Sequence, residues 1–157
     1  MKTIFSRTLA VLAITAVAAL GADNTLGTWK VNVAKSKYTP APLPVKSLTA
    51  VREAAGEGVK VSNTGERADG SPINSTYTAK YDGSASAVTG TGSPYDSIAI
   101  KQKNANTLTY EAKQAGGKYH ATGRTVISAD GKTMTTHAKG VNTEGKPMNL
   151  LLVYDKQ

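Results

Sequence analysis

The chain contains no cysteine, no phenylalanine after Phe5 and a single tryptophan, Trp29. Without cysteine it can form no disulfide bond, no thiolate metal site and no lipid anchor at a lipoprotein-type cysteine. No apolar run after Leu20 is long enough to span a membrane, and Leu, Ile and Val are scarce in the rest of the chain. A low aliphatic content at a modest net charge per residue, combined with regular strand patterning, indicates a thin or hollow core rather than disorder.

The first 22 residues have the composition of a signal peptide. Lys2 and Arg7 give a basic start, Leu9 to Leu20 form an apolar run, and small residues follow up to Ala22. The run is shorter than the roughly 20 apolar residues that a transmembrane helix needs. We therefore expect residues 1–22 to be removed and the mature domain, residues 23–157, to be secreted or periplasmic. A cysteine-free secreted domain favours a bacterial source.

The basic residues are dispersed along the chain. The net charge is +8, or +6 once Lys2 and Arg7 are removed, and no cluster of basic residues stands out. Nucleic-acid-binding proteins usually show a clustered basic footprint, so we expect no nucleic-acid partner. A mildly cationic surface still suits an anionic envelope component, such as a polysaccharide or lipid headgroups.

Turn signals recur at short intervals along the mature chain. The segments between them are rich in Thr, Val, Tyr and Ile with a period of two, and no window has a helical stripe. This spacing is typical of an antiparallel meander, closed as a barrel or folded as a sandwich. The turn signals are Gly56-Glu57-Gly58, Asp69-Gly70, Asp82-Gly83, Asn104-Ala105-Asn106, Gly116-Gly117, Asp130-Gly131 and Glu144-Gly145.

Turn lengths predict strand pairing in the second half of the chain. A two-residue turn at Asp130-Gly131, a three-residue turn at 104–106 and a four-residue loop at 114–117 fix three hairpins. The predicted pairs are Ala129 with Lys132, Ile127 with Met134, Thr125 with Thr136, Lys103 with Thr107, Ile100 with Tyr110, and Ala112 with Tyr119.

Directly paired residues share a face of the sheet, so this register predicts what faces inward. The inner face is apolar or small, and every charge falls outside. The predicted inner residues are Ile98, Ile100, Leu108, Tyr110, Ala112, Tyr119, Ala121, Gly123, Thr125, Ile127, Met134, Thr136 and Ala138. The predicted outer residues are Lys101, Lys103, Thr109, Glu111, Lys113, Lys118, His120, Thr122, Arg124, Val126, Thr135, His137 and Lys139.

The remaining segments are assigned by the same alternation. We expect inward positions for Trp29, Val31, Val33, Val59, Val61, Tyr77, Ala79, Tyr81, Leu150, Leu152 and Tyr154. In the last strand, Leu151 and Val153 are the alternative inward residues to Leu150, Leu152 and Tyr154. The strand near Leu48–Glu53 has no clear register, because Leu48 and Arg52 share a parity. The small-residue tract from Ser84 to Ser93 is interpreted as a mobile loop at the barrel mouth.

Tyrosines and small residues dominate this inner face, which favours an internal cavity. Small residues facing one another across a barrel cannot reach crystal-like packing density, and a barrel of about eight strands can hold a small ligand. The candidate ligand-binding residues are Tyr77, Tyr110, Tyr119, Met134 and Tyr154. Because a buried tyrosine hydroxyl seeks a partner, the ligand is expected to be amphipathic or aromatic. The alternative is that the tyrosines plug the barrel ends around a collapsed middle.

Two terminal motifs carry a family resemblance. Gly27-Thr28-Trp29-Lys30 opens the first strand and Val153-Tyr154-Asp155-Lys156 closes the last. With the hairpin meander, they make residues 25–157 resemble the lipocalin-like and fatty-acid-binding-protein-like barrels of the calycin group, closest to small secreted bacterial lipocalin-like proteins. The resemblance implies a single all-β, antiparallel up-and-down barrel of about eight to ten strands. It also implies that Gly27 and Trp29 close one barrel end.

The chain departs from the fatty-acid carriers of this group at two places. Their helical lid would fall at Thr39–Pro44, where alternating prolines forbid a helix and favour an extended loop. Their inward arginine, two residues before the terminal-strand tyrosine, corresponds to Leu152 here. The register assigns no inward cation anywhere, which argues against fatty acid as cargo.

Other chemistry finds little support in the sequence. His120 and His137 are the only histidines, face outward and lie out of step by roughly 13 Å, too far apart to share a metal ion. No serine–histidine–acid set, inward carboxylate pair or phosphate-binding glycine loop is present. We therefore expect no enzyme, cofactor or metal. The main hypothesis is a secreted, monomeric carrier of a small hydrophobic or amphipathic ligand. The alternative is an envelope or surface interaction module that uses its cationic exterior.

Overall fold

The computed structural model describes residues 22–157 and consists of β-strands with one short 3₁₀ turn. The predicted signal peptide therefore lies outside the described residues, except for Ala22. The strands are β1 (Gly27–Val31), β2 (Lys37–Thr39), β3 (Val45–Ala55), β4 (Gly58–Arg67), β5 (Pro72–Lys80), β6 (Asp82–Thr91), β7 (Ser97–Asn104), β8 (Thr107–Lys113), β9 (His120–Ile127), β10 (Thr133–Val141) and β11 (Pro147–Lys156).

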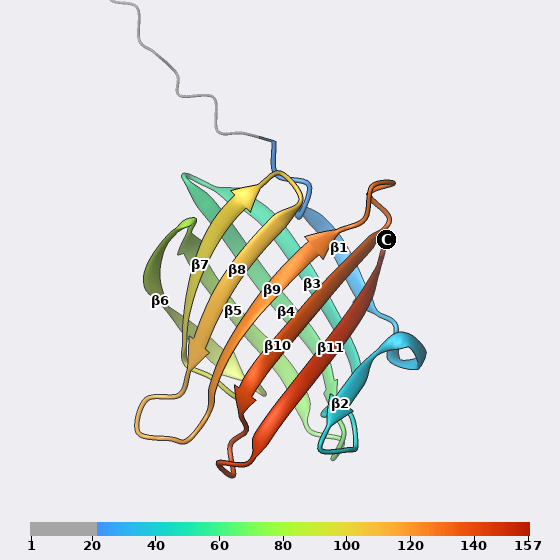
Figure 1. The fold of residues 1–157 in the computed structure, drawn as a ribbon, viewed down its shortest axis with the longest axis vertical. Coiled ribbons are helices and arrows are strands. Elements are labelled where there is room, and N and C mark those ends of the chain that lie inside the picture. The colour runs from blue at the N-terminus through green and yellow to red at the C-terminus, as the bar shows by residue number, and fades with distance from the viewer. Residues whose placement is uncertain (1–21) are drawn as a thin grey trace, which may run out of the picture.

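Ten of these strands close into an antiparallel barrel (Figure 1). From β3 to β11 each strand pairs with the next in the chain, and β1 closes the barrel by pairing with both β3 and β11. Trp29, for example, is opposite Ala50 on β3 and Lys156 on β11. The predicted all-β, up-and-down barrel whose first and last strands meet is confirmed. Among residues 22–157, no helix has the length and apolarity needed to cross a membrane.

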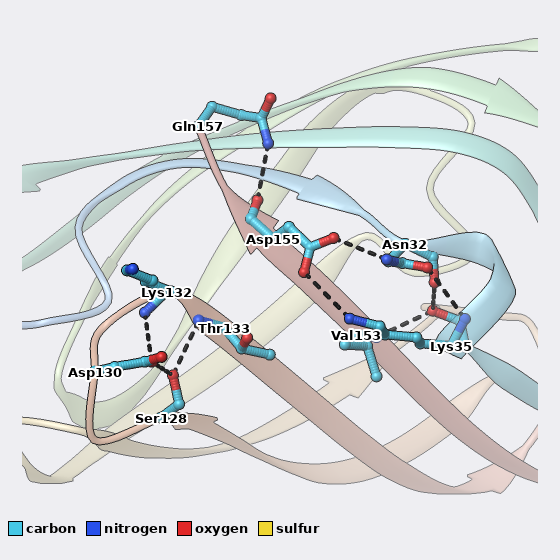
Figure 2. Close-up of polar contacts among 10 residues, drawn as sticks. Asn32, Lys35, Ser128, Asp130, Lys132, Thr133, Val153, Asp155 and Gln157 are labelled. Carbon is cyan, nitrogen blue, oxygen red and sulfur yellow. Dashed lines mark hydrogen bonds and ion pairs between the residues drawn. The ribbon is translucent and has the colours of Figure 1, made fainter.

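The first strand is interrupted after Val31. Asn32 turns the chain into the 3₁₀ turn η1 (Val33–Lys35), and its side chain accepts a hydrogen bond from the Lys35 N–H. Asn32 Nδ2 also donates to Asp155 Oδ2 on β11 at 2.8 Å (Figure 2). β2 then resumes pairing with β11. The prediction that Val33 points inward is wrong, because the strand ends first and leaves Val33 43% exposed.

The predicted register of the second half is largely confirmed. Ile127 pairs with Met134, Thr125 with Thr136, and Ile100 with Tyr110. Polar side chains fix the β9–β10 turn, where Asp130 Oδ1 accepts hydrogen bonds from Ser128 Oγ and the Lys132 N–H (Figure 2). The strands therefore alternate as expected, and the predicted inner face of β7 to β10 points into the barrel.

Two predicted pairs are wrong. The β8–β9 loop has the expected four residues but begins one residue later, because the Gln114 N–H donates to Tyr119 O. Ala112 therefore pairs with Ala121 instead of Tyr119, and this even shift leaves every side chain on its predicted face. In the β7–β8 hairpin, Asn104 rather than Lys103 pairs with Thr107, with an irregularity that restores the register at Gln102.

The small-residue tract Ser84–Ser93 is mainly strand β6, not a mobile loop. Its small side chains are required by close backbone approach: a Cβ on Gly90 would lie 2.1 Å from Asn74 O on β5. Val88 pairs with Tyr77 across the same strand pair. The Thr39–Pro44 segment, in contrast, forms the predicted non-helical connection between β2 and β3.

Candidate ligand-binding cavity

The barrel encloses a cavity of about 230 Å³. Its walls come from β2 to β5 and β7 to β11, and most of the lining is aliphatic or tyrosine. Ile98, Ile100, Leu108 and Leu152, which occupy inward positions predicted from the sequence, form part of its apolar wall. The alternative of a collapsed barrel middle does not fit this geometry.

The structure brings all five candidate residues to this one cavity. Tyr77 lies on β5, Tyr110 on β8, Tyr119 before β9, Met134 on β10 and Tyr154 on β11. They reach the cavity because each faces inward in its strand or loop. Their role in ligand binding stays a prediction.

Tyr95 is a further wall residue that the sequence did not reveal. It lies between β6 and β7, and its ring centroid is 5.8 Å from that of Tyr119 with a tilt of 31°. Burial raises the pKa of Tyr95 well above its usual value. The prediction missed it because Tyr95 follows the small-residue tract and belongs to no alternating strand pattern.

The tyrosines of the cavity are held in the neutral form. Burial raises the pKa of Tyr110 and Tyr154, and raises that of Tyr119 to about 12. A neutral tyrosine can both donate and accept a hydrogen bond. The cavity therefore offers apolar ring faces together with hydroxyl groups that carry no charge at physiological pH.

Arg52 also points into the cavity, which corrects the expectation that no cation faces inward. The unresolved strand is β3, and Leu48, Ala50 and Arg52 alternate along its inner face. Arg52 is 8% exposed, and its Nε and Nη2 make no hydrogen bond within residues 22–157. Arg52 could not be found from the sequence because charged residues were assigned to the outer face of the strands. A second arginine, Arg67, lines the cavity near the opposite end of the barrel, and its Nη1 donates to Gly92 O at 2.9 Å.

One end of the barrel is closed by the segment that precedes β1. Asn24 N–H donates to Ala105 O, so this segment crosses to the β7–β8 turn (Figure 1). Asp23 Oδ1 accepts bonds from the Thr25 N–H and Oγ1, and Tyr81 donates to Asp23 Oδ2 at 2.5 Å. The pKa of Tyr81 rises to about 12, first because of burial and then because of this bond to Asp23.

Trp29 and Gly27 lie directly beneath this segment. Trp29 is fully buried, and its Nε1 donates to Thr25 O at 2.9 Å. The Lys156 ammonium is 5.1 Å from the centre of the indole ring. Gly27 has a φ of +120°, and a Cβ there would lie 3.2 Å from Lys156 Cε. These contacts fit the closing role that the resemblance implies for both residues, which stays a prediction.

The opposite end lies between loops. Pro44, Ser93, Pro94 and Thr143, which come from the β2–β3, β6–β7 and β10–β11 connections, all line the cavity. The cavity therefore extends from beneath the closed end to the loops of the other end, which is the side from which a ligand can reach it.

The histidines lie on the exterior, as the register predicts. His120 Nε2 is 2.9 Å from Glu111 Oε1, and His137 Nε2 is 2.8 Å from Asn149 Oδ1. Within the described part of the chain, no three His, Cys, Asp or Glu side chains are grouped so that they could hold a metal ion.

Comparison with known proteins identifies the fold. No protein-family model and no curated protein sequence matches the chain. Among solved structures, zebrafish ileal bile acid-binding protein complexed with cholic acid is 10% identical with a TM-score of 0.51, covering 86% of this chain and 100% of that one. A redesigned beta barrel, mFAP1, bound to DFHBI, is 14% identical with a TM-score of 0.44, covering 82% and 94%. The chain has a calycin-type barrel fold like that of fatty-acid-binding proteins, as its terminal motifs predict.

Proposed function

We propose that this protein binds a small amphipathic or aromatic molecule inside its barrel. The observation that carries the proposal is the cavity of about 230 Å³, walled by tyrosine and aliphatic side chains and continuous with the loops at one end. Mostly apolar, concave sites with a few placed polar groups are typical of ligand pockets. The bile acid complex of the structurally similar barrel is consistent with this use of the interior.

The residues that line the cavity favour binding of the ligand without chemical conversion. Within residues 22–157, the residues that line the cavity include two arginines, Arg52 and Arg67, and neither carboxylates nor histidines. General acid–base catalysis most often uses those two residue types. The proposal is therefore a carrier or receptor for the ligand, acting as a monomer.

Export is part of the same proposal. The basic start and apolar run of residues 1–22 support secretion or residence in the periplasm of a bacterium. Fractionation of the native cell, followed by N-terminal sequencing of the recovered protein, tests this part. Sequence beginning near Asp23 in an extracytoplasmic fraction supports export, whereas an intact N-terminus in the cytoplasm contradicts it.

The exterior supports a second candidate function. Lys101, Lys103, Lys113, Arg124 and Lys139 are exposed on β7 to β10. Such a surface favours an anionic envelope component by long-range attraction that salt weakens. If this is the function, the protein binds anionic envelope material in a salt-sensitive manner and has no affinity for small molecules.

Titration with naphthalene tests the interior site, because this neutral probe depends on the cavity alone. The matched variants are Ser75→Phe and Thr78→Phe, which add the same ring to opposite faces of β5: Ser75 is buried in the cavity wall and Thr78 is exposed. We expect the wild type and Thr78→Phe to bind naphthalene and Ser75→Phe to lose most of the affinity. A wild type that does not bind, or equal binding by all three proteins, would overturn the proposal.

A further inference from the structure

Arg52 is the charged group inside this barrel that the fold does not explain. It sits on β3 opposite Gly27 of β1 and Val61 of β4, and is 8% exposed. The charge of its guanidinium acts to lower the pKa of Tyr81, against the larger effect of burial. Tyr81 is in turn bonded to Asp23 of the closing segment. The arginine therefore lies toward the closed end of the cavity, away from the loops through which a ligand arrives.

The charge of Arg52 has no counter-ion in the protein. An arginine stays protonated in proteins, and an unpaired buried charge is destabilising. No ion pair links Arg52 to a carboxylate within residues 22–157, and its Nε and Nη2 lack hydrogen-bond partners there. Asp23, the carboxylate of the closing segment, is already bonded to Thr25 and Tyr81. An anion that enters the cavity would satisfy these donors.

Neighbouring groups are suited to the same anion. The pKa of Tyr77 is raised by burial, and the charge of Arg52 and a side-chain hydrogen bond with Arg52 only partly offset this, so the Tyr77 hydroxyl keeps its proton and remains a donor. The pKa of Tyr154 is likewise raised chiefly by burial, and the charge of Arg52 only partly offsets this. Gln102, on the inward side of β7, carries the other buried donor without a partner in the described chain, Nε2. Within the described residues, Arg52 and Gln102 are the two side chains whose buried donors lack a hydrogen-bond partner, and such groups in a folded protein call for an explanation.

The size and polarity of the cavity limit the rest of the molecule. An engineered apolar cavity of about 150 Å³ holds benzene, so about 230 Å³ corresponds to roughly nine heavy atoms inside the walls. Tyrosine rings and aliphatic chains form most of those walls. The body of the ligand is therefore apolar or aromatic, and a longer tail would extend between the loops at the open end.

We propose that the bound molecule is a small organic monoanion, an aromatic or short-chain carboxylate, held with its carboxylate on Arg52 and its apolar body toward the open end. This inference rests on the proposed binding function. This anchor also distinguishes the chain from the fatty-acid carriers that it resembles. Their inward arginine corresponds to Leu152 on β11, whereas Arg52 lies on β3. The anchor is supplied by a different strand.

Calorimetric titration with two matched probe pairs tests the assignment: benzoate against benzamide, and cinnamate against cinnamamide. The members of each pair have the same shape and differ in charge. Arg52→Met removes the charge and keeps an unbranched side chain, although a shorter one, a change that buried sites often tolerate. Arg67→Met makes the same change at the open end of the same cavity. Naphthalene binding by each variant verifies that the cavity is intact.

We expect the wild type to bind the acids more tightly than the amides by about tenfold to hundredfold, the range for charge-assisted hydrogen bonds. Arg52→Met should abolish this preference, and Arg67→Met should retain most of it. The Nε–H resonance of Arg52 should shift when benzoate is added. Wild-type protein that binds naphthalene but does not prefer the acids, or a preference that survives in Arg52→Met, overturns the inference and leaves the proposed function standing. Failure to bind naphthalene overturns the proposed function itself.

Discussion

The two ends of the barrel are built from different contacts. At the closed end, Asp23 and Thr25 hold the segment before β1 across the opening by hydrogen bonds to Tyr81 and Trp29. At the open end, the cavity reaches loop residues such as Pro44 and Pro94. Order and access are therefore separated in this molecule: one end closes the barrel near the buried Arg52, and the cavity extends to the loops of the other end.

Replacing Trp29 with Ala is expected to have the largest effect, because it removes the fully buried ring on which the closed end rests. Truncation of a buried tryptophan costs about 3–5 kcal/mol of unfolding free energy. Urea denaturation measures this loss. Val33→Ala, at an exposed site on η1, is the control and should stay within about 0.5 kcal/mol of the wild type. A loss no larger than that of the control would show that Trp29 does not organise the closed end.

Alkaline pH is the next perturbation, and it acts on both ends through their tyrosines. The folded state raises the pKa of Tyr81 and of Tyr119 from 10 to about 12, in both cases chiefly by burial. Because folding favours the neutral form, the resulting stability is fully present below pH 10 and is lost as the pH rises toward 12. Urea midpoints across this range, together with tyrosinate absorbance, measure the effect. The Tyr81→Phe variant should lose stability less steeply, and identical slopes would contradict this.

The hydrogen bonds of Asp23 allow the closed end to be compared with a similar turn at the open end. Asp23 and Asp69 make the same local contacts, each accepting bonds from the N–H and hydroxyl two residues on, but only Asp23 also binds a tyrosine. Asp23→Ala should cost about 1–3 kcal/mol, the range for leaving a partly buried partner unsatisfied. Asp69→Ala, in an exposed turn at the open end, should cost less. Equal losses would mean that the Tyr81 contact adds nothing.

A bulky side chain at the open end should have the smallest effect on stability and a clear effect on access. Thr143 is exposed and lines the cavity, so Thr143→Trp narrows the mouth. We expect slower naphthalene association by stopped flow, with stability within about 0.5 kcal/mol of the wild type. Ala129→Trp, an exposed site on the β9–β10 turn at the closed end, should leave the association rate unchanged. If Ala129→Trp slowed naphthalene association and Thr143→Trp did not, the ligand would enter at the end that we describe as closed.

The sequence predicted most of the fold because strand alternation and turn chemistry are local properties. Ile100 and Tyr110 could be paired from one short turn, and the even shift at Ala112 left the faces correct. The inner tyrosines followed from the same register. These signals come from neighbouring residues, so no knowledge of the distant strands was needed.

The errors arose where tertiary contacts override local patterns. Arg52 has the parity of Leu48, and only the complete barrel shows that both face the cavity. Val33 continued the alternation of β1, but Asn32 ends that strand through its bonds to Lys35 and Asp155. The glycines of β6 resembled a loop because the requirement for small residues comes from the approach of β5. The anion site was therefore beyond sequence reasoning, although the cavity around it was not.

Xenon binding to crystals under pressure tests the central claim, that the barrel interior is an apolar chamber open to solvent at one end. Xenon occupies apolar cavities of this kind without depending on the identity of the natural ligand. We expect a xenon site inside the barrel against Ile98, Leu108 and Leu152, and we expect Ser75→Phe to lose it. An interior filled by ordered side chains, with no xenon between these residues, would contradict it.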